Sequence, residues 1–377
     1  MNNNNKLHFL DGLRGWAAFV VLLHHTLFYL LARINPLFAD HVFRFITNGR
    51  LAVFVFFILS GFVLSVRFIR EPEKKSLAAA ATSRYFRLAI PVAGASFVAY
   101  ILMRTGLMYN IPAAAVSLET GGLNTWLASF YDFAPSLHSL LSFSFYTTLL
   151  SFDGAVHTYN SNLWTMPYEF AGSMLIYFVL GVFVREKPEP VFQVPLLMVT
   201  FVLFCIEPKF ACFLFGYFLA KVDHRWRGPI SNWKYCHLVF GLSLILPIGL
   251  STAYSFDERD HCIALLALMI VAAALFFKPF RGFLDSPISR FMGRISFPLY
   301  LVQIPIICSL SSYLLLALPR YGYSLLATSY IDAVVTVLFT LCCAYAFTPV
   351  EIFSIHASKR IAQRLLVSVP PLSNLWR

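Results

Sequence analysis

One arginine and one histidine share a predicted face of the first apolar segment. Arg14 and His25 are eleven residues apart, so on an α-helix their side chains point within about 20° of each other and lie about 16 Å apart along the axis. That distance is roughly half the hydrocarbon thickness of a bilayer. A neutral imidazole at such a depth suits general base catalysis. The alternative is structural, with Arg14 anchoring the helix at the cytosolic surface and His25 bound to a neighbouring group.

Arg84 and Arg87 are three residues apart at the start of another apolar segment. This spacing places both guanidinium groups on one face of a helix, and guanidinium groups bind phosphate through paired hydrogen bonds. The pair therefore predicts a site for a phosphorylated donor that arrives from the cytosol. Two arginines at the cytosolic end of a span are also common topology determinants, and this interpretation stays open.

Trp164 and Glu169 lie at the entrance to a further apolar segment. In the first turn of a helix, a carboxylate such as Glu169 interacts favourably with the helix dipole. Beside a wet pocket, the same carboxylate can orient an imidazole. Trp164 is equally typical of the aromatic belt at a membrane surface. A structural and a catalytic interpretation both fit this segment.

The composition predicts that membrane-spanning helices carry these residues. Of the 377 residues, 59% are apolar and 12% are charged, and the mean hydropathy is +0.71. A soluble domain has about twice that charged fraction, and disordered chains are poor in apolar residues. The net charge of +11 lies in short loops and indicates a cytosolic membrane face rather than nucleic-acid binding. The seven cysteines lack paired spacing, so we expect no disulfide framework and no metal site.

Eleven apolar segments are candidates for membrane spans, and several are shorter than the roughly 20 residues that a crossing needs. They lie near 15–31, 51–69, 88–105, 138–152, 165–184, 191–206, 209–222, 236–252, 261–277, 295–318 and 328–350. Basic residues in 67–87, 278–294 and the C-terminal tail place these stretches and both termini in the cytosol, which requires an even number of crossings. We therefore expect an all-α, polytopic transmembrane bundle of about ten spans. One short segment, 138–152 or part of 191–222, would be re-entrant or interfacial. Residues 1–377 would form a single membrane domain without a soluble domain.

Six short motifs between residues 10 and 301 together resemble the acyltransferase-3 family of integral-membrane acyltransferases. Each motif is weak alone, but all six occur in the order of the family. They are Leu10-Asp11-Gly12-Leu13-Arg14-Gly15, His25, Phe56-Phe57-Ile58-Leu59-Ser60-Gly61-Phe62, Arg84-x-x-Arg87, Leu163-Trp164-Thr165-Met166 with Glu169, and Gly293-Arg294-Ile295-Ser296-Phe297-Pro298-Leu299-Tyr300-Leu301.

The resemblance implies transfer of an acyl group, usually acetyl from acetyl-CoA, to a hydroxyl of a carbohydrate or lipid-linked glycan. His25 would be the catalytic base and Arg14 its partner on the same helix. Arg84 and Arg87 would bind the acyl-CoA at the cytosolic face. Trp164 and Glu169 match the aromatic and acidic positions of the family, and we assign Trp164 to donor binding and Glu169 to catalysis. We expect the protein to lie in the plasma or inner membrane, in contact with lipids. We expect no metal cofactor.

Two departures from the family pattern concern the site. The family usually has Trp-Ser-Leu before its glutamate, whereas Thr165, Met166 and Pro167 precede Tyr168 and Glu169 here. The Tyr-Leu-x-His of the family is Tyr300-Leu301-Val302-Gln303 here, so no titratable group is available at the last position. The fused extracytoplasmic module of some relatives is missing, and we expect the membrane domain to perform the whole reaction.

Three functional classes remain open. In an enzyme, the acyl group can pass directly from donor to acceptor with His25 as the base, or through an acyl-histidine intermediate. In a transporter or flippase, the intramembrane polar residues form the pathway. A non-catalytic sensor or scaffold is a third class, and it predicts that Arg84 and Arg87 can be replaced without effect. An aromatic stretch at 106–136, which includes Trp126, can either contact sugar or anchor the chain at the interface.

Overall fold

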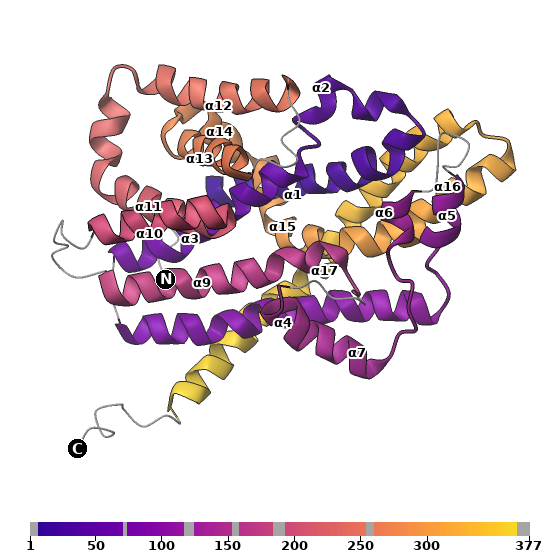
Figure 1. Ribbon diagram of the computed structural model, residues 1–377, viewed down its shortest axis with the longest axis horizontal. Helices are drawn as coiled ribbons and strands as arrows, with labels where there is room; N and C mark the ends of the chain where they lie inside the picture. The colour runs from indigo at the N-terminus through magenta and orange to yellow at the C-terminus, as the bar shows by residue number, and fades with distance from the viewer. Residues whose placement is uncertain are drawn as a thin grey trace.

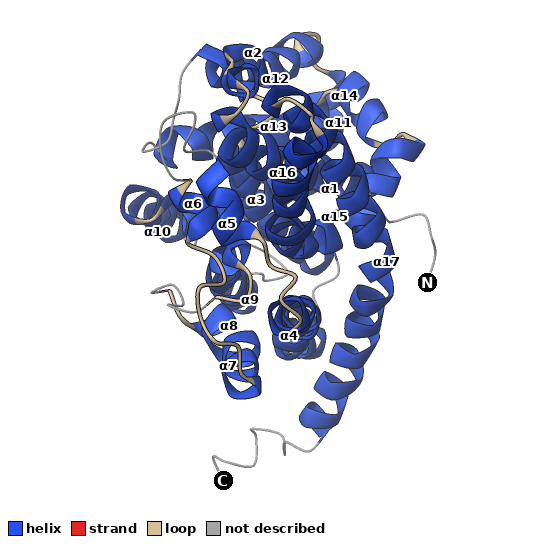
Figure 2. Cartoon of the chain, turned by 90° about the vertical axis from the view of Figure 1, so that its right-hand side faces the viewer, coloured by secondary structure: helices blue, strands red, loops and turns tan. Residues whose placement is uncertain are grey.

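The computed structural model describes residues 7–70, 74–116, 124–152, 158–183, 193–253 and 260–367. Within these ranges the chain is helical and contains no strand, as predicted. Figure 2 shows the same helical architecture from the end of the bundle. The helices of the first half are α1 (His8–Leu23), α2 (His41–Arg44), α3 (Gly49–Arg70), α4 (Lys74–Arg104), α5 (Asn110–Val116), α6 (Thr125–Ala128), α7 (Leu137–Ser142), α8 (Thr148–Leu150) and α9 (Met166–Phe183).

The second half continues with longer helices. They are α10 (Gln193–Ile206), α11 (Pro208–Asn232), α12 (Cys236–Ala253), α13 (Asp260–Phe276), α14 (Lys278–Leu284), α15 (Pro287–Ile306), α16 (Ser312–Ala317) and α17 (Leu325–Val367). Two short segments near the site have other helical geometries. A π-helical stretch, η2 (His24–Leu30), continues α1, and a 3₁₀ turn, η7 (Ser161–Thr165), leads into α9.

Seven helices in the described part of the chain are long and apolar enough to cross a membrane, and an eighth crossing is made if α13 and α14, bent by 90°, form one broken span. The sequence predicted about ten. Three of the eleven predicted segments are not among these helices. Segment 138–152 forms the short α7, a π-helical turn and α8, and segments 191–206 and 209–222 correspond to α10 and α11. Helix α10 has only 14 residues, and the second half of α11 carries charged residues such as Asp223 and Arg227. The number of spans is therefore approximate.

The long helices run side by side along the long axis of the molecule (Figure 1). Helix α1 packs against α15 and α3, α3 packs against α11, and α17 packs against α4. The start of α1 and the end of α17 lie toward the same end of the bundle (Figure 1).

Glycines bring the backbones of α1 and α15 into direct contact. A Cβ atom at Gly15 would overlap the backbone of Met292 in α15, and one at Gly12 would overlap the carbonyl oxygen of Leu284 at the end of α14. On the opposing helix, a Cβ atom at Gly293 would meet the backbone of Asp11. Small residues permit such close packing of membrane helices. The glycines on both sides of Arg14 therefore fix where this arginine lies relative to α15.

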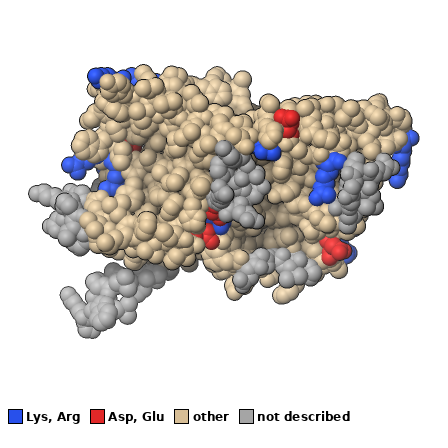
Figure 3. All heavy atoms as spheres, turned by 45° about the horizontal axis from the view of Figure 1, so that its top comes forward, with Lys and Arg blue, Asp and Glu red and all other residues tan. Residues whose placement is uncertain are grey.

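The face of the molecule in Figure 3 is largely uncharged. It shows small, separate groups of charged side chains with broad neutral areas between them. Large apolar side chains such as Phe178, Phe201 and Leu338 are more than half exposed. Exposed apolar side chains on many helices are expected where the surrounding solvent is lipid, so these faces agree with a multi-pass membrane protein.

Candidate active site

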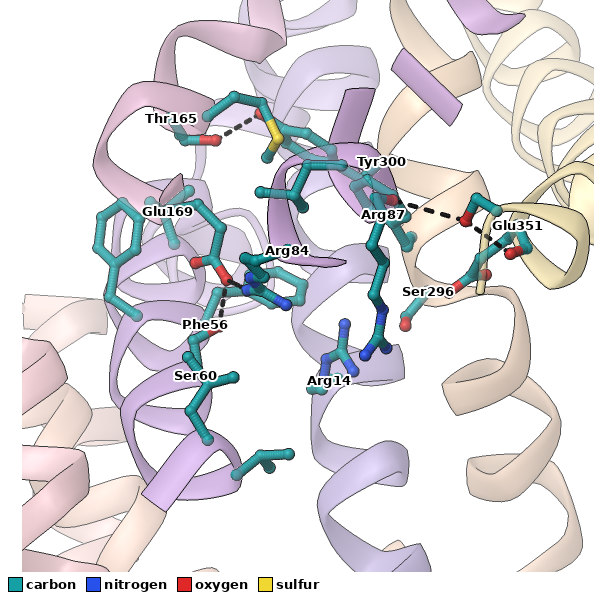
Figure 4. A pocket seen from close by; sticks show the side chains of 18 residues that line it. Arg14, Phe56, Ser60, Arg84, Arg87, Thr165, Glu169, Ser296, Tyr300 and Glu351 are labelled. Carbon is teal, nitrogen blue, oxygen red and sulfur yellow. Dashed lines mark hydrogen bonds and ion pairs between the residues drawn. The ribbon is translucent and has the colours of Figure 1, made fainter. Parts of the chain in front are cut away.

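Three arginines and two glutamates line a cavity of about 120 Å³ between α1, α3, α4, α9, α15 and α17. The charged residues are Arg14, Arg84, Arg87, Glu169 and Glu351. Figure 4 shows that they come from four helices, α1, α4, α9 and α17, and point toward a common space. With three cations against two carboxylates, the cavity favours an anionic ligand. We call it the arginine cavity.

Arg84 and Glu169 form an ion pair within the arginine cavity. The Nε of Arg84 also donates to the hydroxyl of Ser173, at 3.0 Å. The hydroxyl of Ser60 donates to Oε1 of Glu169 at 2.6 Å. These bonds join α3, α4 and α9, and both contacts to the carboxylate are made by its Oε1. Glu169 therefore fixes the position of Arg84. In one interpretation of the sequence, Glu169 would orient the imidazole of His25, but His25 does not line the arginine cavity.

Arg14 and Arg87 are the two arginines that this network leaves available. Their guanidinium groups face each other in Figure 4, and neither makes a hydrogen bond or an ion pair with the described residues. Glu351 attracts both groups from α17. Two neighbouring guanidinium groups without a fixed hydrogen-bond partner can take up phosphate oxygens in bidentate fashion.

His25 lines a second, larger cavity of about 480 Å³, which we call the histidine cavity. Its imidazole stacks on the indole of Trp126, with ring centroids 5.7 Å apart and an interplanar angle of 9°. Tyr29 stacks on the same indole at 5.0 Å. Trp164 and Tyr168 contribute further aromatic surface. The volume lies within the range of about 300–1,000 Å³ that is common for small-molecule sites.

The imidazole of His25 lies where regular α-helical geometry ends, because the π-helical stretch begins at His24. Single π-helical turns often occur at functional sites. Nδ1 of His25 is buried and has no hydrogen-bond partner among the described residues. The fully buried side chain of Gln303 lies beside the ring. Its Nε2 donates to the carbonyl of Tyr300 at 3.3 Å, whereas its Oε1 has no partner in the described chain.

The arginine and histidine cavities adjoin, and three residues line both of them. These are Val53, Thr165 and Tyr300. The phenol of Tyr300 donates to the carbonyl of Asn162, and its oxygen is 2.7 Å from the hydroxyl oxygen of Thr165. The boundary between the cavities is thus one side-chain layer thick and contains two hydroxyl groups.

The loop before α9 is held against α15 at this boundary. Nδ2 of Asn160 donates to the carbonyl of Leu301 at 2.6 Å, and Nδ2 of Asn162 donates to that of Tyr300 at 3.4 Å. Pro298 and Pro305 lie within α15, and a proline removes one backbone hydrogen bond from a helix. The asparagines therefore bind α15 carbonyls in a region where the helix itself leaves some of them available.

The structure brings four of the six predicted site residues into one cavity and places the other two in the neighbouring one. Arg14, Arg84, Arg87 and Glu169 line the arginine cavity, whereas His25 and Trp164 line the histidine cavity. Trp164, assigned from the resemblance to donor binding, is therefore on the side of the imidazole. Arg14 and His25 share a helix but are separated by the layer that contains Tyr300.

Several lining residues were not singled out as site residues from the sequence. Lys209 and Arg50 line the histidine cavity, and both pair with Asp260, at 3.2 Å and 2.6 Å respectively. Glu351, on α17, is separated from the predicted site residues by a long stretch of chain. An acidic residue in an apolar segment was a detectable signal for Glu351. No group of three metal-binding side chains occurs among the described residues.

Comparison with known proteins identifies the family of this chain. The family model described as an acyltransferase domain matches residues 7–349. An O-acetyltransferase of Phomopsis amygdali, PaAT-1, is 26% identical over an alignment that covers 95% of this chain and 84% of that protein. No solved structure matches the chain significantly. The family match covers most of the chain and all lining residues of the two cavities except Glu351 and Ser354. This protein therefore belongs to the acyltransferase-3 family and is a membrane-embedded O-acyltransferase.

Proposed function

We propose that the protein transfers an acetyl group from cytosolic acetyl-CoA to a hydroxyl of a carbohydrate or lipid-linked glycan. The observation that carries this proposal is the adjacency of the two cavities. One presents guanidinium groups, the other presents an imidazole, and they share Val53, Thr165 and Tyr300. Such an arrangement lets a phosphorylated donor and an alcohol acceptor approach one point from two sides.

The arginine cavity is the proposed donor site. Arg14 and Arg87 would bind phosphate oxygens of acetyl-CoA. Arg84 would act mainly through its ion pair with Glu169, which fixes α4 and α9. A cavity of about 120 Å³ holds only part of the donor, so the thioester end of the pantetheine arm would enter it, with the diphosphate beside Arg14 and Arg87 and the adenosine outside. The basic stretch before α4 supports a cytosolic location for this side.

The histidine cavity is the proposed acceptor site. The rings of Tyr29, Trp126, Trp164 and Tyr168 offer apolar faces with polar edges, a combination that suits a sugar ring with its hydroxyl groups. Trp164 is about half exposed, so it can meet an acceptor that enters from outside. We place Trp164 at the acceptor rather than at the donor for this reason.

His25 is the proposed general base. It would take the proton from the acceptor hydroxyl as the oxygen attacks the thioester carbonyl carbon. When the tetrahedral intermediate collapses, the C–S bond breaks, and the imidazolium returns the proton to the thiolate of CoA. A ternary complex explains why both cavities meet at one boundary. The alternative route forms an acyl-histidine intermediate first, and radiolabelled acyl trapped on the protein without acceptor would identify it.

Acetyl transfer can be tested with the purified full chain in lipid nanodiscs and in cells. Cells with and without the protein are compared for the O-acetyl content of their surface glycans, and the nanodiscs are supplied with radiolabelled acetyl-CoA. The proposal predicts O-acetylated product with wild type and none with His25→Ala. Unchanged glycan O-acetylation together with no consumption of acetyl-CoA would contradict it. Full substrate export by His25→Ala would instead favour a transporter.

A further inference from the structure

We propose that the hydroxyl groups of Tyr300 and Thr165 form the oxyanion-stabilising site for acyl transfer. This inference rests on the proposed function, because it assumes a thioester in the arginine cavity and a base in the histidine cavity. The reaction needs a hydrogen-bond donor at the carbonyl oxygen as negative charge develops there. Neither Arg14 nor His25 supplies it directly, since they lie on opposite sides of the boundary.

The position of the reacting carbon follows from the two cavities. It must be within reach of a donor in the arginine cavity and of an alcohol activated by His25. Among the residues that the structure describes, the two cavities share Val53, Thr165 and Tyr300. Val53 offers no polar side-chain atom, so the donors at this point are the hydroxyls of Thr165 and Tyr300.

The hydrogen bonds at the boundary form a directed chain. The single phenol proton of Tyr300 is donated to the carbonyl of Asn162. The hydroxyl of Thr165, 2.7 Å from the phenol oxygen, must therefore donate to Tyr300. A hydroxyl that accepts a hydrogen bond becomes a stronger donor. Rotation of the phenol O–H away from Asn162 would direct this polarised donor at the carbonyl oxygen of the thioester.

The surroundings favour such a role. Both residues are buried, with 7% exposure for Tyr300 and 5% for Thr165, and in a water-poor site a hydrogen bond to a developing charge is stronger than in water. The asparagine bonds between the loop and α15 hold the pair in place. As the alcohol oxygen bonds to the carbonyl carbon, the π electrons move to the carbonyl oxygen, which Tyr300 would stabilise. They return when the C–S bond breaks.

The inference can be tested with variants that remove each hydroxyl group but keep the shape of the side chain. Tyr300→Phe should lower kcat by about 100-fold or more, as for loss of an oxyanion donor, and leave the KM for acetyl-CoA within about threefold. Thr165→Val should have a smaller effect in the same direction. The double variant should lose little more than Tyr300→Phe, because the two groups act as one chain.

Matched controls exist elsewhere in the bundle. The buried phenol of Tyr131 also donates to a backbone carbonyl, that of Tyr159 at 3.0 Å, and it lines neither cavity. The hydroxyl of Thr200 is buried and donates to the carbonyl of Leu196. Tyr131→Phe and Thr200→Val should retain near wild-type kcat. Thermal unfolding of all four variants measures whether the chain is still folded.

Acetyl-CoA hydrolysis distinguishes an electrostatic role of Tyr300 from a role as a barrier between the two cavities. Water as the nucleophile forms the same kind of oxyanion, so Tyr300→Phe should lower hydrolysis and glycan acetylation by the same factor. Hydrolysis that rises while acetylation falls would show that Tyr300 only separates the cavities and would overturn the inference, as would a Tyr300→Phe enzyme with over half the wild-type kcat. If wild type itself neither transfers nor hydrolyses acetyl groups, the proposed function fails instead.

Discussion

The two adjoining cavities differ in what holds them together. The arginine cavity is small and rests on charged contacts between helices, above all the pair of Arg84 and Glu169. The histidine cavity is four times larger and rests on stacked rings. The difference indicates that one cavity binds the donor and the other the acceptor. Fixed charges suit a phosphorylated donor that is the same in every reaction, whereas a larger aromatic cavity can accommodate acceptors of different structure.

Loss of the base should have the largest effect on activity. His25→Ala should reduce kcat by about 100-fold to 10,000-fold, the usual contribution of a positioned acid–base group. CoA binding should stay unchanged, because His25 lies outside the arginine cavity. The measurement is steady-state acetylation at saturating acetyl-CoA. The exposed His138 provides the control, since His138→Ala should leave the rate unaltered.

Breaking the central ion pair should act mainly on stability. Glu169→Gln leaves Arg84 largely buried without its counter-charge, and loss of one partner of a buried pair costs about 3 kcal/mol or more. We expect a lower midpoint of thermal unfolding in detergent. Asp285→Asn is the matched control, because the pair of Arg290 and Asp285 is about half exposed and should contribute little. Equal midpoints for both variants would show that the buried pair is not structural.

Loss of a donor-binding arginine should weaken CoA affinity without slowing the chemical step. Arg87→Ala removes charge-assisted hydrogen bonds worth about 1.5–3 kcal/mol, which corresponds to a rise in KM for acetyl-CoA of roughly 10-fold to 150-fold. Arg87→Lys should recover only part of the affinity, because an ammonium group cannot bind phosphate through two parallel bonds. An unaltered KM for acetyl-CoA in both variants would show that the donor binds elsewhere.

Replacement of Gln303 should have the smallest effect on activity among these substitutions. Its Oε1 and Nδ1 of His25 both lack partners among the described residues, and a small rotation would pair them and direct Nε2 of the imidazole toward the cavity. Gln303→Leu should then lower kcat about fivefold, in line with a hydrogen bond of about 1 kcal/mol, with little change in KM. A change in KM alone would mean that Gln303 shapes the cavity instead.

The sequence could predict the parts of this protein that depend on local pattern. Apolar runs located most helices, and the spacing of Arg84 and Arg87 placed them on one face toward a common cavity with Arg14. The glycines beside Arg14 belonged to a motif of the family, but their contact with α15 is visible only in the fold. Span counting was less successful, because α10 is short and α11 is partly charged.

The boundary of the two cavities could not be predicted because it depends on tertiary contacts. Thr165 and Tyr300 are 135 residues apart, and neither spacing nor hydropathy relates them. Trp126 stacks on His25 from a segment that the sequence allowed to be a mere membrane anchor. The change to π-helical geometry at His24 also has no local signature. Each of these features depends on which helices pack together.

The central claim is that donor binding and proton transfer occur in separate cavities that meet at one boundary. Equilibrium titration of CoA into nanodiscs that hold wild type, His25→Ala or Arg87→Ala tests it most directly. The account predicts equal dissociation constants for wild type and His25→Ala, and a value at least about 10-fold higher for Arg87→Ala. Weakened CoA binding by His25→Ala, with wild-type affinity in Arg87→Ala, would contradict it.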